Sequence, residues 1–465
     1  MSIRLFSMHL QLSFVLLALA DAGLLLISPY LALSLGSGIP GLSLVRLDAA
    51  LLPAAVIFAL FCLISLFAVG LYSTRQRCSR EGVVVRVVAA ITNSVVLSAL
   101  VYYFLPELAM SRGTLSIAAA IATFSCLTIR ALSDHLLDED LFKRRVLVFG
   151  AGRRAACLGE LRRRTDTRGF RLVAFIAADG DHLTVSADRL MERPTDLHRW
   201  SLENQIDEIV VAMDDRRRAF PAHEFLECRL SGIPVTELSV FLEREAGKVR
   251  LAALSPSSII FGEGFEESDI KQWLLRGLDV LVSIGLLVAS LPVMLLTALA
   301  IILEEGWRAP VLFRQRRVGR YGKPFNVLKF RSMRVDAERD GAVWAAPDDS
   351  RNTRVGRFIR KVRIDELPQL INVLRGEMSL VGPRPERPEF VEQLEQALPY
   401  YRGRHVVRPG ITGWAQLCYP YGANEKDALE KLQYDLYYVK HRSLLFYLMI
   451  ILQTVEVVLW QKGAR

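Results

Sequence analysis

The chain has 465 residues, of which 52% are hydrophobic, and its formal net charge is +9. This length is more than one compact core usually holds and predicts two or three domains. Apolar runs long enough to cross a bilayer exclude a wholly soluble protein. The positive charge suits anionic lipids and phosphorylated substrates, and no nucleic-acid-binding motif is recognisable. We therefore expect a membrane protein with no nucleic-acid partner.

Four apolar stretches open the chain, and each can supply a transmembrane helix. They run roughly from His9 to Leu35, Asp48 to Tyr72, Val83 to Leu105, and Thr114 to Ser133. Basic residues gather in the second connection and after the fourth stretch, so the positive-inside rule puts both ends of the bundle in the cytoplasm. The first stretch has no clear cleavage site and is interpreted as a retained span. The sequence thus predicts a transmembrane bundle over residues 1–140.

A charged residue, Asp21, lies inside the first apolar stretch. A charge at that depth costs about 2.5–3.5 kcal/mol on insertion scales. Asp21 could be functional, but packing against a neighbouring helix of the bundle is the simpler interpretation.

Residues 141–262 have the pattern of a cytoplasmic α/β domain. The expected strands run over Val146–Phe149, Phe170–Ala177 and Ile206–Met213. Helical stretches between them predict a parallel, Rossmann-like sheet. The turn from Gly150 through Gly152 to Ala155 matches GxGxxA, in which small residues let backbone amides approach a pyrophosphate. Two interpretations stay open: a nucleotide turn at Gly150 and Gly152, or a structural or regulatory domain that has lost its ligand.

The last segment, residues 263–465, opens with an apolar run from Leu278 to Leu303. Basic residues flank this run on both sides, so both of its ends favour the cytoplasm. Ser290 and Pro292 lie near its middle, where a proline can kink the helix and a serine hydroxyl can satisfy a freed carbonyl. We predict a re-entrant helix over 276–303 that enters and leaves on the cytoplasmic face. An ordinary kinked span is the alternative.

The remainder of this segment combines basic residues with one acidic pair. A strand-like stretch places Lys329 and Arg331 on one face. Asp365 and Glu366 precede a Leu-Pro-Gln sequence that favours the start of a helix, where the helix dipole stabilises anions. Adjacent carboxylates there point about 100° apart, so one can attack phosphorus while the other holds Mg²⁺. Capping of the helix is the alternative role for this pair.

Five motifs in order make the chain from about Ile270 onward resemble the bacterial sugar transferases, also called monotopic phosphoglycosyl transferases. They are Lys329-Phe-Arg-Ser-Met, Asp365-Glu-Leu-Pro-Gln, Gly382-Pro-Arg-Pro, Arg408-Pro-Gly-Ile-Thr-Gly-Trp and Asp435-Leu-Tyr-Tyr. The preceding segments resemble those of the large members, which start exopolysaccharide or O-antigen repeat units. The expected fold is an α-helical membrane bundle, an α/β Rossmann-like domain and a mainly α monotopic catalytic domain with a re-entrant helix.

The resemblance implies transfer of a sugar-1-phosphate from a UDP-sugar to undecaprenyl (polyprenyl) phosphate. Asp365 would attack the β-phosphorus, release UMP and form a phosphosugar-aspartyl intermediate, while Glu366 would bind Mg²⁺. The residues implied in binding or supporting substrate are Lys329, Arg331, Arg360, Arg384, Pro385 and Asp435. The chain departs from the family where Arg363 replaces a common serine or threonine, and where Leu291 separates Ser290 from Pro292.

Two other classes of function stay open. One is a membrane-tethered, NAD-dependent sugar-nucleotide dehydratase, although the α/β segment has no Tyr-x-x-x-Lys pair. The other is a nucleotide-binding scaffold or regulator with an inactive transferase domain. We expect the bacterial inner membrane with soluble domains in the cytoplasm, which fits six scattered cysteines without a CxxC pair. Expected partners are a UDP-sugar (glucose or galactose only by analogy), polyprenyl phosphate, the lipid bilayer and, as an open option, a second copy.

Overall fold

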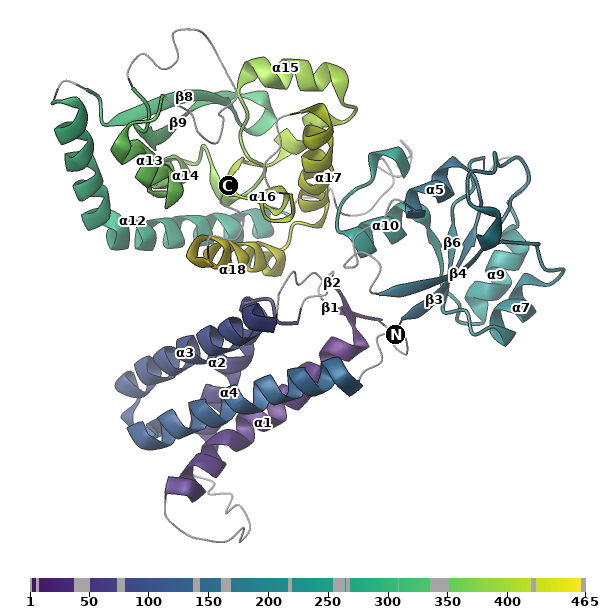
Figure 1. The fold of residues 1–465 in the computed structure, drawn as a ribbon, viewed down its shortest axis with the longest axis horizontal. Coiled ribbons are helices and arrows are strands. Elements are labelled where there is room, and N and C mark those ends of the chain that lie inside the picture. Colours follow the sequence, from purple (N-terminus) through teal and green to yellow (C-terminus); the bar gives the residue numbers. More distant parts are fainter. Residues whose placement is uncertain are drawn as a thin grey trace. The chain divides into compact units, whose positions relative to one another are not determined.

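The structure is a computed structural model (Figure 1). The chain divides into two compact units, Met1–Ala246 and Gly247–Arg465. The first unit contains apolar helices and a parallel sheet, and the second is mainly helical. The residues described are 2–5, 8–36, 51–72, 80–136, 143–159, 169–215, 220–253, 264, 268–307, 309–334, 351–419 and 424–460.

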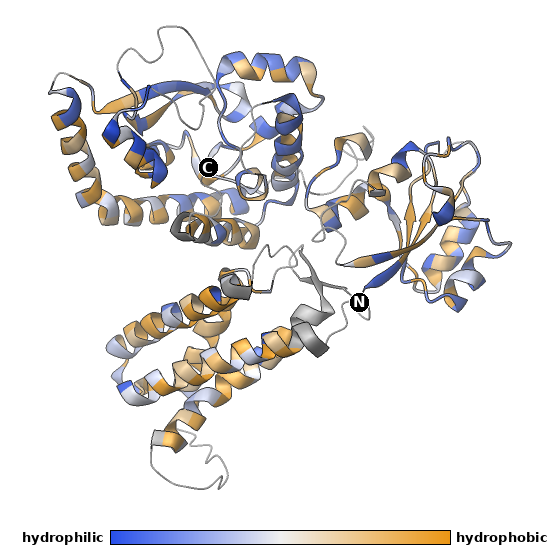
Figure 2. Ribbon diagram, in the orientation of Figure 1, coloured by the Kyte–Doolittle hydropathy of each residue, from blue (hydrophilic) through white to orange (hydrophobic). Residues whose placement is uncertain are grey.

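Within the described residues of the first unit, four long apolar helices confirm the predicted helical stretches. They are α1 Leu12–Gly36, α2 Leu52–Ala68, α3 Arg80–Phe104 and α4 Arg112–Leu136. Hydrophobic residues dominate all of them (Figure 2). By length and composition α1, α3 and α4 can each cross a membrane, and α2 is a shorter apolar helix. One expected boundary is wrong, because Met8–Gln11 forms a strand (β2) paired with Ser2–Leu5 (β1), so the first helix starts at Leu12 rather than His9.

The charge inside α1 is paired with two side chains. Asp21 is fully buried, accepts a hydrogen bond from the Tyr72 hydroxyl at 2.6 Å, and forms an ion pair with Arg130 of α4 at 3.0 Å. Pairing offsets part of the cost of burying a carboxylate among apolar helices. The arrangement supports the packing interpretation, since Asp21 ties the first helix of the bundle to the fourth.

A parallel sheet follows the bundle, with five strands in the part of the unit that the structure describes. The strands are β3 Arg144–Phe149, β4 Phe170–Ile176, β5 Leu190–Met191, β6 Glu208–Val211 and β7 Val235–Glu237. Their order, β5-β4-β3-β6-β7, runs outward in both directions from the first strand, as in a doubly wound α/β sheet. The accompanying helices are α5 Arg153–Gly159, α7 Leu197–Glu203, α9 Ala222–Leu230 and α10 Leu238–Ala246. The predicted parallel sheet is therefore confirmed.

The second unit combines a long helix, a hairpin and several short helices. Strands β8 Leu312–Val318 and β9 Pro324–Phe330 pair antiparallel, and β10 Ser379–Val381 pairs parallel with β11 Gly410–Thr412. The helices are α12 Asp269–Glu305, α13 Arg354–Lys361, α14 Gln369–Arg375, α15 Pro388–Ala397, α16 Trp414–Cys418, α17 Glu425–His441 and α18 Leu444–Trp460. The described residues of this unit also contain four 3₁₀ turns: η4 Leu251–Ala253, η5 Arg320–Gly322, η6 Ile364–Glu366 and η7 Tyr401–Val406.

Both ends of α12 bind the same unit. Near its start, Arg276 donates to two backbone oxygens at the end of α14, at 2.6 and 2.8 Å. Near its end, Glu304 accepts from the first two backbone amides of α13, at 2.7 and 3.0 Å. A straight helix of 37 residues would extend about 55 Å. The ribbon of α12 instead turns through a sharp bend, and its two limbs run along two sides of this unit (Figure 1).

The middle of α12 contains the predicted proline but not the predicted serine contact. Pro292 lies inside the helix, and a proline there is a usual cause of a sharp bend. The Ser290 hydroxyl donates to the sulfur of Met294 at 3.6 Å. The expectation that Ser290 satisfies a freed carbonyl was therefore wrong. Thr297 makes a bond of that kind, donating to the backbone oxygen of Val293 at 2.8 Å.

Candidate active site

The acidic pair lies at the start of a short helix. Asp365 and Glu366 occupy the 3₁₀ turn η6, and Pro368 then forms the N-cap of α14. Arg363, just before this turn, has a φ of 62°, in the left-handed region that non-glycine residues seldom adopt. Gly376, with a φ of 81°, ends α14. The local sequence thus fixes the backbone on both sides of the two carboxylates, at Arg363 before them and at Gly376 after α14.

Three cations surround the Glu366 carboxylate. Its Oε1 atom lies 3.2 Å from Lys329 Nζ and 3.3 Å from Arg384 Nη2. Arg363 Nη1 lies 3.9 Å from the same oxygen. Burial alone would raise the pKa of Glu366, but these positive charges outweigh burial and hold the pKa below its usual range. Glu366 is therefore ionised at neutral pH and gathers basic side chains around the turn.

The neighbouring carboxylate is buried and only partly satisfied. Asp365 is 8% exposed, and its Oδ1 atom has no hydrogen-bond partner among the residues that the structure describes. Burial raises the pKa of Asp365, and the charge of Glu366 raises it further, against the opposing effect of Lys329. A buried carboxylate oxygen without a partner is costly. Such an atom in a basic surrounding marks a position for a ligand or a reacting group.

Two other predicted arginines lie on elements next to this turn. Arg360, in the last turn of α13, donates to Asn352 Oδ1 at 2.6 Å, and its charge acts on Asp365. Strand β9 ends at Phe330, so Arg331 lies just beyond it rather than within it. In the described part of the chain, the Nε and Nη1 atoms of Arg331 are buried without a hydrogen-bond partner. Buried guanidinium donors of this kind are suited to an anion such as a phosphate.

Asp435 contacts Arg404 rather than the acidic pair. The Arg404 and Asp435 side chains are 6% and 3% exposed, and their charged atoms lie 2.8 Å apart. Burial raises the pKa of Asp435 to about 6, although Arg404 opposes this shift. Arg404 also donates to the backbone oxygen of Arg384 at 2.9 Å and to the Tyr401 hydroxyl at 2.7 Å. Asp435 therefore acts through Arg404, which holds the segment that presents Arg384 to Glu366.

Arg404 could not be predicted from the sequence, because it is one of several arginines in a basic stretch without a distinguishing motif. Pro385 is a predicted substrate contact. In the structure the carbonyl oxygen of Pro385 accepts a hydrogen bond from Arg317 at 3.1 Å, which fixes the turn after Arg384. Gln416 was also not predicted, and its Oε1 accepts from Arg384 at 3.2 Å.

The donor set of the acidic pair fits a magnesium ion that keeps most of its own ligands. Mg²⁺ is commonly held by one or two carboxylates together with water and substrate phosphate oxygens. Asp365 and Glu366 supply two adjacent carboxylates, of which Glu366 would hold the ion while the orphaned Oδ1 of Asp365 stays available to react. Among the described residues, no group of three or more His, Cys, Asp or Glu side chains forms a closed cage. The site therefore suits a cation that arrives with phosphate.

The glycine turn of the first unit is filled by the chain's own carboxylates. Asp214 accepts from the first two backbone amides of α5, both at 2.9 Å, and Asp181 accepts from the Ala151 amide at 2.8 Å. A Cβ atom at Gly152 would lie 2.0 Å from Asp214 Oδ2, so this glycine makes room for the carboxylate. Asp214 thus takes the position that a phosphate would occupy. This geometry favours a structural role for Gly150 and Gly152 over a nucleotide turn.

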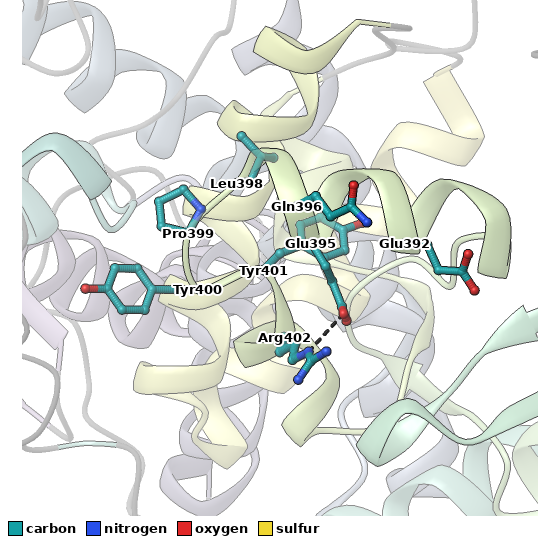
Figure 3. Close-up of a pocket in the computed structure, with 8 residues that line it drawn as sticks. All are labelled: Glu392, Glu395, Gln396, Leu398, Pro399, Tyr400, Tyr401 and Arg402. Atoms are coloured by element: carbon teal, nitrogen blue, oxygen red, sulfur yellow. Dashed lines mark hydrogen bonds and ion pairs between the residues drawn. The ribbon is translucent and has the colours of Figure 1, made fainter.

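A separate hollow of about 490 Å³ lies between α15 and η7 (Figure 3). Its lining residues are Glu392, Glu395, Gln396, Leu398, Pro399, Tyr400, Tyr401 and Arg402. Arg402 pairs with Glu395 at 2.9 Å, which leaves Glu392 as a second acid in the wall. Two carboxylates and one cation are unfavourable for a nucleotide diphosphate. This hollow is therefore a poor candidate for the donor phosphates.

Comparisons with known proteins support the family resemblance that the five motifs indicated. The profile of the bacterial sugar transferase family matches residues 270–461. A UDP-N-acetylgalactosamine-undecaprenyl-phosphate N-acetylgalactosaminephosphotransferase of Aeromonas hydrophila is 40% identical over 285 residues, which are 61% of this chain and 65% of that protein. A UDP-glucose:undecaprenyl-phosphate glucose-1-phosphate transferase of Xanthomonas campestris pv. campestris is 31% identical over 347 residues, covering 72% and 71%.

A third relative, the UDP-glucose:undecaprenyl-phosphate glucose-1-phosphate transferase of Escherichia coli K12, is 43% identical over 192 residues, or 40% of each chain. The match thus spans less than two thirds of the A. hydrophila and E. coli proteins. It spans more than two thirds of the X. campestris protein, at 31% identity. The chain belongs to the bacterial sugar transferase family.

Proposed function

We propose that this chain is a membrane enzyme that transfers a sugar-1-phosphate from a UDP-sugar to undecaprenyl phosphate. The relatives named above carry this activity in their names, for N-acetylgalactosamine or for glucose. The observation that carries the proposal is the buried Asp365, whose Oδ1 atom has no partner among the described residues and which adjoins the cation-ringed Glu366. A capping role alone would not require three cations around this turn.

In the proposed reaction, the carboxylate of Asp365 attacks the β-phosphorus of the UDP-sugar. A bond forms between the carboxylate oxygen and phosphorus, and the bond to the bridging oxygen breaks, so that UMP leaves with the electron pair. An oxygen of undecaprenyl phosphate then attacks the same phosphorus. This second step releases Asp365 and gives a polyprenyl diphosphate-sugar.

The surrounding residues have distinct roles in this proposal. Lys329, Arg384 and Arg331 bind phosphate oxygens and stabilise the charge that develops on the transferred group. Glu366 would hold Mg²⁺, which neutralises phosphate charge when it is bound. Asp435 is a positioning residue, because it acts on the site through Arg404.

We further propose that α12 is a re-entrant membrane helix and that the second unit lies on the cytoplasmic face of the inner membrane. Support comes from the bend of α12 and from the bonds of Arg276 and Glu304, which attach both ends of the helix to one unit. Apolar residues predominate along α12 (Figure 2). This placement would hold the acidic pair near the lipid headgroups, where undecaprenyl phosphate presents its phosphate.

The decisive experiment uses the detergent-solubilised full chain with radiolabelled UDP-sugars and Mg²⁺. We expect UMP release and a label that stays on the denatured polypeptide, with both lowered about 10³-fold or more in Asp365→Asn. Glu395→Gln, a surface change in the same unit, is the matched control and keeps wild-type rates. A panel of UDP-glucose, UDP-galactose and UDP-N-acetylgalactosamine identifies the sugar. Undiminished UMP release from Asp365→Asn would refute the nucleophile assignment.

A further inference from the structure

Four arginines line one small hollow of the second unit, on elements that are far apart in the sequence. They are Arg276 of α12, Arg320 of η5, Arg408 just before β11 and Arg442 just after α17. One carboxylate, Asp279, lines the same hollow. Its Oδ1 atom accepts from the Leu380 amide at 2.8 Å, from the Ser379 hydroxyl at 3.0 Å and from the Tyr447 hydroxyl. Asp279 therefore serves mainly to join α12 to β10 and α18.

The hollow carries an excess of positive charge. Four guanidinium groups meet one carboxylate, and the oxygen of that carboxylate is already bonded to three donors. Burial lowers the pKa of Arg408, and the charges of Arg276 and Arg320 lower it further. Arginine nevertheless stays charged at neutral pH. A cluster of like charges in a half-buried place is stabilised by an anion, and planar guanidinium groups match phosphate oxygens well.

This hollow is distinct from the acidic pair. Arg276 bonds to the last carbonyl oxygens of α14, whereas Asp365 precedes the first turn of that helix. Along a helix of that length, the two places lie about 10 Å apart. An anion bound by these arginines is therefore not the phosphate that reacts at Asp365.

Apolar surface borders the hollow on α12. Ile270, Trp273 and Leu274 of α12 are 73%, 76% and 57% exposed, and they flank Gln272 and Arg276. The same helix continues into the longest apolar stretch of the described chain. Exposed apolar side chains beside a basic hollow are typical of a surface that meets acyl chains and headgroups together.

We propose that Arg276, Arg320, Arg408 and Arg442 bind the phosphate of a membrane lipid. The enclosed volume is about 20 Å³, room for one water molecule. A phosphate is larger than this enclosed space, so it would lie outside it, against the guanidinium groups that line the hollow. Anionic phospholipids and undecaprenyl phosphate share this chemistry. The inference rests on the proposed function only in that it places this unit at the bilayer surface.

The test is lipid binding by the full chain, measured by native mass spectrometry in detergent without any donor sugar. Phosphatidylglycerol and undecaprenyl phosphate are titrated separately. Arg320→Gln combined with Arg442→Gln is expected to weaken binding of at least one lipid about tenfold or more. The same pair changed to lysine retains charge and recovers part of the binding. Arg402→Gln, an exposed arginine outside the hollow, is the matched control and binds both lipids as the wild type does.

The two lipids distinguish the sources of the phosphate. A loss confined to undecaprenyl phosphate identifies a holding site for the acceptor, and a loss for both lipids identifies a general headgroup site. Wild-type affinity for both lipids in the glutamine double variant would overturn the proposal. If that variant melts early, Arg442→Gln alone replaces it, with an expected loss of about threefold or more. Asp365→Asn is expected to retain lipid binding, so failure of the transfer mechanism and failure of this site are separable.

Discussion

Replacing Arg404 with methionine tests whether the buried ion pair supports the active-site segment. Arg404 and Asp435 are 6% and 3% exposed and lie 2.8 Å apart, so the substitution leaves a buried carboxylate without its cation. Breaking a buried pair in this way costs about 3–5 kcal/mol. For a unit of this size, that loss lowers the melting temperature by about 10 °C. The Arg384 segment also loses a backbone bond, so kcat/KM is expected to fall as well.

The loss of stability should depend on pH with a defined sign. In the folded chain the pKa of Asp435 is about 6, above its ordinary value of 3.8. A carboxyl group with a raised pKa binds protons more tightly in the folded state, so its contribution to stability falls as pH rises from about 4 to about 6. Removing Arg404 raises the pKa of Asp435 further. The penalty of the variant is therefore larger at pH 8 than at pH 5.

The assay is thermal unfolding of the detergent-solubilised full chain at both pH values. Arg402→Met is the matched control, because this arginine is 85% exposed and its surface pair with Glu395 contributes about 1 kcal/mol or less. The double change of Arg404→Met with Asp435→Leu should recover most of the stability, since no charge is then left buried. A loss in Arg404→Met no greater than that of Arg402→Met, or one that is equal at pH 5 and pH 8, would refute the reasoning.

Three further outcomes are expected. Gly152→Ala places a Cβ atom 2.0 Å from Asp214 Oδ2 and displaces that carboxylate from the two backbone amides it binds. The free energy of unfolding is expected to fall by about 2–4 kcal/mol. Thermal unfolding measures this loss, and an unchanged melting temperature would contradict it. Lys329→Ala lowers kcat/KM for the UDP-sugar about 10- to 100-fold, whereas a purely structural lysine would leave it unaltered. With the six native cysteines changed to serine, a single cysteine introduced at Asp269 or at Glu305, the two ends of α12, reacts with an impermeant thiol reagent from the same side of sealed vesicles. Labelling of the two positions from opposite sides would exclude a re-entrant helix.

Secondary-structure elements, which depend on neighbouring residues, could be predicted from the sequence. The apolar helices and the parallel strands follow from residue periodicity and apolar length, which act over neighbouring residues. Strand β9 ended one residue before Arg331, and α1 began three residues after His9, because hydrogen bonding determines where elements end. The order of short motifs along the chain likewise predicted that Asp365 and Glu366 are site residues.

The partners of hydrogen bonds and ion pairs between residues far apart in the sequence could not be predicted in the same way. The bond between Arg404 and Asp435 joins residues 31 positions apart, and the bond from Asp214 to the turn of α5 spans 60 positions. Many arginines and aspartates are chemically equivalent as candidates for such bonds. Only the packing of α17 on η7, or of neighbouring strands in the sheet, selects one of them.

The sequence by itself determined that the chain carries apolar helices, a parallel sheet and one acidic doublet within a basic segment. Those properties depend on composition and spacing along the backbone. The tertiary structure decided that Lys329 and Arg384 lie beside the Glu366 carboxylate. It likewise decided that both ends of α12 bind the same unit. It also decided that Asp214 closes the glycine turn. These outcomes depend on which distant side chains meet, because charge and hydrogen-bond energies act across space rather than along the chain.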